Sequence, residues 1–112
     1  MILTATIAGC GTPATENKQL PPVKPQASSL RDGFSTMDRL VEAARKESSL
    51  TVIGLPRDWM NYGEIIDTFS DEYGIKVNQV EPGASSQREI EAAAALKPDV
   101  FDLSLEVAVA NA

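Results

Sequence analysis

The sequence lacks histidine altogether and contains a single cysteine, Cys10. Without an imidazole, the chain has no histidine for general acid–base catalysis and is missing the commonest protein ligand for metals. One cysteine excludes an internal disulfide and a cysteine-rich zinc site. No apolar run approaches the roughly 20 residues with which an α-helix spans a bilayer.

Positive charge is also scarce, with 10 Lys and Arg against 16 Asp and Glu, which gives a net charge of −6. Nucleic-acid binders usually carry a basic patch, and none is visible, so we expect no nucleic-acid partner. The chain also has no Gly-x-Gly-x-x-Gly, Walker or Gly-x-Ser-x-Gly motif. We therefore expect no catalytic residue, no cofactor and no metal, and a protein that is not an enzyme.

The chain is composed like an ordinary soluble protein, with 43% hydrophobic and 23% charged residues. Its length of 112 residues suits one small domain at most. A domain of this size buries only about two thirds of its unfolded surface, so we expect a modest core.

The first ten residues close with Ile7-Ala8-Gly9-Cys10, which resembles the bacterial lipobox. Small residues there suit the signal peptidase, and the thiol accepts the lipid. We expect residues 1–9 to be a residual signal peptide and Cys10 to be lipidated; the alternative is an incidental cysteine. A signal peptide also needs a basic segment and a longer apolar stretch. Neither precedes Ile7, so we expect an upstream start codon or a truncated sequence.

Residues 10–34 contain four prolines among polar residues and show no apolar periodicity. This composition is typical of a flexible, partly extended linker. A tether between a lipid anchor and a folded body has this composition, and so does any disordered tail. We expect regular structure to begin near Ser35.

From there the sequence alternates between two periodicities. Residues 35–48, 61–73 and 86–97 have helical spacing, with Ser35, Asn61 and Ser86 as capping residues and an acid three positions after each. Residues 50–55, 75–80 and 99–105 read as strands, and 106–112 can begin another helix. The expected inner faces are Tyr62, Ile65, Ile66, Phe69 and Tyr73 in the second helix, and Ile90, Ala93 and Ala94 in the third. This order predicts an α/β layer with parallel strands and right-handed crossovers.

Ligands of such sheets bind at the carboxyl ends of the strands, near helix N-termini. Trp59 can stack on a cation or merely cover the sheet edge, and Tyr62 can face a ligand or the core. Asp58 suits a cationic solute and Arg57 an anionic one, so the charge of the solute stays open. Asn61 and Ser86 can be simple helix caps. The acids of the helices, Glu64, Asp67, Asp71, Glu72, Glu89 and Glu91, are expected on solvated faces. The candidate ligand-binding residues are Arg57, Asp58, Trp59, Asn61, Tyr62, Ser85, Ser86 and Gln87.

Residues 50–63, 65–69 and the Tyr-Gly-Ile-Lys-Val run at 73–77 resemble the start of the mature part of ABC-importer solute-binding proteins. The nearest group is the spermidine/putrescine type with its iron-type relatives. The resemblance implies an incomplete three-layer α/β lobe of the periplasmic-binding-protein kind, with residues 35–112 as the first segment of lobe 1. It also implies an extracytoplasmic protein, anchored to the membrane through Cys10, that delivers a small solute to permease subunits. A surface lipoprotein with a structural or interaction role, and a small Rossmann-like enzyme, are the alternatives.

Overall fold

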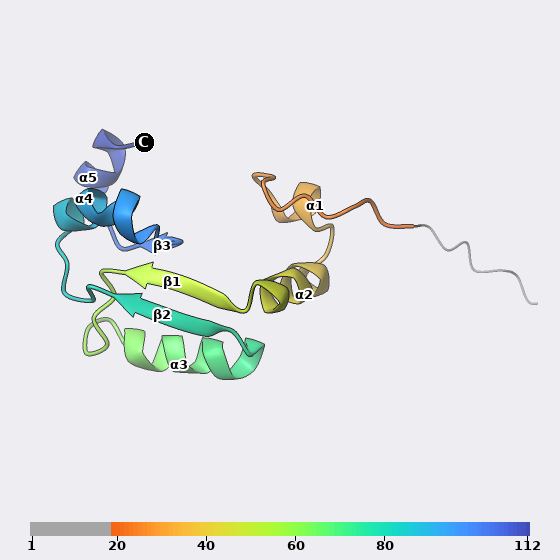
Figure 1. The fold of residues 1–112 in the computed structure, drawn as a ribbon, viewed down its shortest axis with the longest axis horizontal. Coiled ribbons are helices and arrows are strands. Elements are labelled where there is room, and N and C mark those ends of the chain that lie inside the picture. Colours follow the sequence, from red (N-terminus) through yellow and green to blue (C-terminus); the bar gives the residue numbers. More distant parts are fainter. Residues whose placement is uncertain (1–18) are drawn as a thin grey trace, which may run out of the picture.

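The computed structural model describes residues 19–112 and confirms a mixed α/β chain. Within that range, the parallel strands β1 (Ser49–Ile53), β2 (Lys76–Val80) and β3 (Val100–Phe101) form one sheet in the order β2-β1-β3 (Figure 1). The helices are α1 (Leu30–Gly33), α2 (Met37–Glu47), α3 (Tyr62–Tyr73), α4 (Ser86–Leu96) and α5 (Leu105–Ala110).

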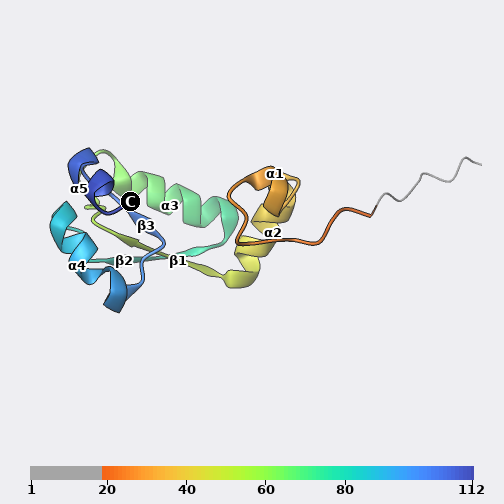
Figure 2. The same ribbon diagram turned by 90° about the horizontal axis from the view of Figure 1, so that it is seen from above.

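The core gathers around β1, the central strand. Val52 and Ile53 of this strand are buried, and Ile53 has no exposed surface. Helices α3 and α4 lie on opposite sides of the sheet (Figure 2), and they contribute buried Ile66 and Ala92 respectively. Parallel strands joined by right-handed crossovers place successive helices on opposite faces when the third strand pairs with the other side of the first.

The helix starts differ from the expected capping boxes. Ser35 adopts a left-handed conformation with φ 70°, so Thr36 takes the extended cap position of α2 and accepts from the Arg39 N–H. Ser85, not Ser86, caps α4 by accepting from the Arg88 N–H. Asn61 precedes α3 with φ 61°, and its side chain donates to Glu64 instead of accepting from a backbone N–H. A capping residue needs extended backbone, and Asn61 lacks it.

The expected inner faces of two helices are partly wrong. Ile65 is 54% exposed, whereas Ile66 is buried and Gly63 lies against the Arg57 backbone. In α4 the buried pair is Glu89 and Ala92, whereas Ala94 is exposed. The prediction of a solvated face is therefore wrong for Glu89.

The third strand is shorter than the expected range 99–105. Only Val100 and Phe101 pair with β1, opposite Val52 and Ile53. Beyond them, the Asp102 N–H donates to the Glu89 carboxylate and not to a neighbouring strand. The chain then turns at Ser104 into α5, so the helix expected near the C-terminus is confirmed.

Regular structure begins before Ser35, contrary to expectation. Ser29 caps α1 by accepting from the Asp32 N–H, and Lys24 donates its N–H to the Gly33 carbonyl. Gly33 is buried, and a Cβ there would lie 2.9 Å from the Lys24 carbonyl oxygen, so this turn needs glycine. Among residues 19–112, no helix has the length and apolar character to cross a membrane.

Candidate functional site

A hollow of 520 Å³ lies where the carboxyl ends of the three strands meet. Gly54 follows β1, the loop 82–85 follows β2, and residues 102–104 follow β3. This is the edge at which parallel α/β sheets bind ligands. The lining residues are Gly54, Pro56, Trp59, Pro82, Gly83, Ala84, Ser85, Ser86, Asp102, Leu103 and Ser104.

An aromatic pair stands beside the hollow. Trp59 lines it with 53% of its surface exposed, and its ring meets Tyr62 edge-on at a centroid separation of 5.9 Å. The Tyr62 hydroxyl donates to Asp102 Oδ2 over 2.9 Å. This hydrogen bond to a carboxylate is the main reason why the pKa of Tyr62 is raised, because it stabilises the neutral phenol. Tyr62 thus reaches the hollow through Asp102, while Trp59 reaches it directly.

Glu89 lies beneath the hollow with only 1% of its surface exposed. Its Oε2 accepts from the Asp102 N–H over 3.0 Å. Burial raises the pKa of this carboxyl, the Asp102 N–H lowers it, and the nearby Asp102 charge raises it further. Sequence reasoning missed this role because a glutamate in a polar helical stretch is usually solvated.

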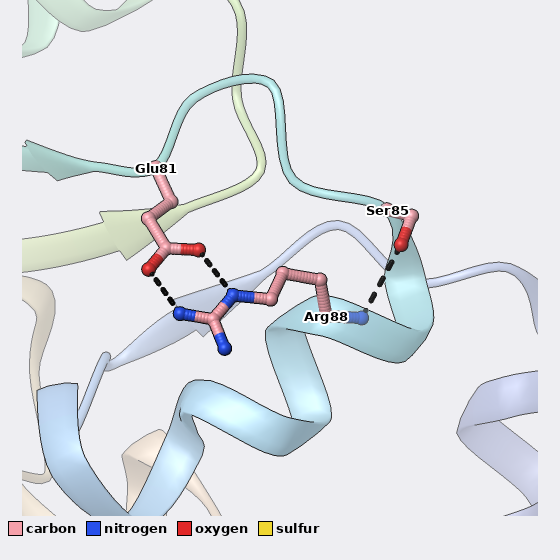
Figure 3. A network of polar contacts seen from close by, with 3 residues as sticks. All are labelled: Glu81, Ser85 and Arg88. Carbon is pink, nitrogen blue, oxygen red and sulfur yellow. Dashed lines mark hydrogen bonds and ion pairs between the residues drawn. The ribbon is translucent and has the colours of Figure 1, made fainter.

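The loop after β2 is held at both ends by hydrogen bonds to Arg88. Figure 3 shows Arg88 reaching from the first turn of α4 back to Glu81, with two hydrogen bonds of 2.7 and 2.8 Å. Bidentate pairing of this kind is the geometry that guanidinium and carboxylate prefer. The hydrogen bond to Arg88 lowers the pKa of Glu81. Ser85 caps the same helix, so Pro82 to Ser85 are held between two contacts with Arg88.

A hydrogen bond also connects the start of α4 to the segment after β3. Ser86 Oγ accepts from the Ser104 N–H over 2.8 Å. Both residues line the hollow, so this bond joins two of its walls. Ser85 and Ser86 were expected at the site, whereas Ser104 was hidden inside the range expected to be a strand.

Arg57 is not among the residues that line the hollow. Its guanidinium pairs with Asp67 Oδ2 of α3 at 2.6 Å, and this contact raises the pKa of Arg57. Asn61 contacts Glu64 through its side chain. The structure therefore brings together three of the eight candidates, Trp59, Ser85 and Ser86, with Tyr62 behind them; Arg57, Asp58, Asn61 and Gln87 are not among the lining residues. Cys10 lies outside the described residues.

A second groove, of 660 Å³, lies between α2 and the end of α3. It sits at the amino ends of the strands, since α2 ends just before β1 and α3 just before β2. Lys46 and Glu42 pair with each other there over 2.8 Å. The larger groove is thus remote from the edge at which the strand-end loops converge.

Comparisons of the chain with protein-family models, with curated proteins and with solved structures find no match. Within residues 19–112, no group of three or more acidic or sulfur side chains is placed to hold a metal ion. What the site offers is an aromatic face, serine hydroxyls and a carboxylate around an open hollow.

Proposed function

We propose that this chain is the solute-binding component of an ABC importer and captures a small polyamine-like solute outside the membrane. The observation that carries the proposal is the hollow at the carboxyl ends of the strands, with Trp59 exposed beside Asp102. Small-molecule sites combine a largely apolar wall with a few placed polar groups, as this one does.

The charge of the lining supports a cationic solute. Among the lining residues Asp102 is the one with a formal charge. Both nearby guanidiniums are already engaged, Arg57 by Asp67 and Arg88 by Glu81. Within the described part of the chain, no cationic side chain pairs with Asp102. An ammonium group can therefore meet Asp102, and its neighbouring methylenes can lie on the face of Trp59.

The hollow is open, so it supplies one wall of the proposed site. Good sites bury about 70–90% of the surface of a small molecule. In the proposed architecture a second lobe closes over this wall, in the manner of hinged binding proteins. We expect the 112-residue chain to bind its solute weakly, with a dissociation constant of about 1 mM, and the closed two-lobed site to bind it far more tightly. The proposal also includes permease subunits as the partners that receive the solute, and a lipid on Cys10 as the membrane anchor.

The test is an NMR titration of the labelled 112-residue chain with spermidine, and with glutarate as an anionic control. We expect spermidine to shift the Trp59 indole N–H and the amides of Ser85, Ser86 and Asp102 in a saturable way. Trp59→Ala should weaken binding by about 1 kcal/mol or more. The matched control is Met60→Ala, which alters a neighbouring side chain that is 67% exposed and outside the lining. Equal shifts with glutarate, or equal affinities for both variants, would contradict the proposal.

A further inference from the structure

Glu89 is the one buried charged side chain among the described residues, and no cation accompanies it. Taking a carboxylate out of water is unfavourable unless hydrogen bonds or a counter-charge compensate. A helix that packs on a sheet usually turns an apolar side chain toward it. The position of Glu89 under the hollow therefore calls for an explanation other than packing.

The carboxyl group of Glu89 joins three elements. It belongs to α4, and Oε2 accepts from the Asp102 N–H after β3. It also lies against the Cα of Gly54, at the end of β1. A Cβ on Gly54 would overlap the Glu89 carboxyl group and would lie 2.9 Å from its Oε2. Gly54, with φ +73°, thus provides both the backbone conformation and the space for this carboxylate.

From Glu89 the contacts lead to the proposed solute site. The Asp102 backbone is held by Glu89, and the Asp102 side chain accepts from the Tyr62 hydroxyl. Tyr62 in turn packs against the edge of Trp59. Ser104 has its own bond to Ser86, so the loss of Glu89 would free the Asp102 N–H while Ser104 stays attached.

We infer that Glu89 is a positioning residue of the proposed solute site. Held against Gly54, its carboxyl group binds the Asp102 N–H. This contact sets the position of the Asp102 carboxylate relative to Tyr62 and Trp59. This inference rests on the proposed function for the meaning of the site, while the positioning itself is a property of the chain without solute. The titratable groups that face Glu89 are Asp102, from the segment after β3, and Tyr62, from α3. Glu89 and Asp102 place two acidic groups next to each other, which a cationic solute would relieve.

The experiment compares Glu89→Ala, Glu89→Gln and the control Glu91→Ala, which alters an exposed acid of the same helix. Hydrogen exchange of the Asp102 amide is measured by NMR, with the amide of Val52 in the central strand as an internal reference for global stability. Glu89→Ala should accelerate exchange at Asp102 by about tenfold or more relative to Val52, because the amide loses its acceptor. Glu89→Gln keeps an acceptor oxygen and should restore protection to within about twofold of the parent chain.

Spermidine affinity should follow the same order, weakened by about five- to tenfold in Glu89→Ala and largely restored in Glu89→Gln. Unchanged Asp102 exchange in a folded Glu89→Ala chain overturns the inference, and so does full spermidine affinity in that variant. If Glu89→Ala does not fold, the Glu89→Gln chain decides. Retained protection of the Asp102 amide from exchange supports the inference, and loss of that protection in a folded chain overturns it. If no chain binds spermidine, the proposed function fails while the exchange data still decide the positioning.

Discussion

Replacing Gly54 by alanine is expected to be among the most damaging single-methyl changes in this chain. Two costs add. An L-residue at φ +73° pays the left-handed conformational penalty of about 1–2 kcal/mol. The new Cβ also displaces the Glu89 carboxyl group, which is the flexible end of a side chain and can move, but only by giving up its bond to the Asp102 N–H. An unsatisfied buried group costs about 1–3 kcal/mol more.

The sum of about 2–5 kcal/mol is a large share of the free energy of unfolding of a small domain, which is about 5–15 kcal/mol. The assay is urea unfolding followed by far-UV circular dichroism. Gly74→Ala is the matched control, because Gly74 has nearly the same φ of +68° and nothing lies within 4 Å of its Cβ position. Gly74→Ala should therefore lose only the conformational part, about 1–2 kcal/mol.

A third chain isolates the contact with Glu89. In a Glu89→Ala background the clash is absent, so Gly54→Ala should cost no more than Gly74→Ala does in the parent chain. Such a double-mutant cycle measures the coupling between two residues in contact. Equal losses for Gly54→Ala and Gly74→Ala in the parent chain would refute the tight fit between Gly54 and Glu89.

Three further outcomes are expected. Because burial raises the pKa of Glu89, the folded chain binds this proton more tightly than the unfolded chain does. The free energy of unfolding should therefore fall as the pH rises from 4.5 through that raised pKa. Glu89→Gln should flatten this part of a stability profile measured by urea unfolding, and an unchanged slope would contradict the prediction. In a Tyr73→Phe chain, ultraviolet titration reports Tyr62 alone, and its pKa should lie above the ordinary value of 10.0 and fall toward it in Asp102→Asn. With a complete signal peptide in a bacterium, the parent chain should fractionate with membranes and Cys10→Ser should not, because each buried CH₂ of the acyl chains contributes about 0.8 kcal/mol; equal membrane retention would exclude the anchor.

From α2 onward, the order of elements could be predicted from the apolar repeats of the helices and strands, whereas α1 (Leu30–Gly33) was not predicted. The strand at 50–55 and the helix at 61–73 match β1 and α3 closely for that reason. Exact helix starts could not be predicted, since Ser35 and Thr36, or Ser85 and Ser86, are adjacent residues with equal capping chemistry. The backbone conformation decides between them, and the rest of the fold sets that conformation.

The third strand shows a different limit. Residues 99–105 alternate like a strand, yet only two residues pair with β1. The Asp99 carboxylate accepts from the Thr51 N–H over 2.8 Å, and the Asp102 N–H turns to Glu89. Asp99 lies at the start of the strand and also donates its own N–H to the Thr51 carbonyl, so the contact found where pairing stops is the bond between the Asp102 N–H and Glu89. No period in the sequence records a side-chain contact of this kind.

The charge of the proposed solute site depends on contacts of the same long-range kind. From sequence, Arg57 and Asp58 are adjacent and could neutralise each other, which left cationic and anionic solutes equally open. The fold instead gives Arg57 to Asp67 and Arg88 to Glu81, ten and seven residues away along the chain. Each pairing engages a guanidinium with another carboxylate, while the Asp102 carboxylate has the Tyr62 hydroxyl as its partner and the Asp102 N–H donates to Glu89. In the proposed site, the negative charge of the lining therefore follows from where the two arginines are bound, because Asp102 is the one charged residue among the lining residues.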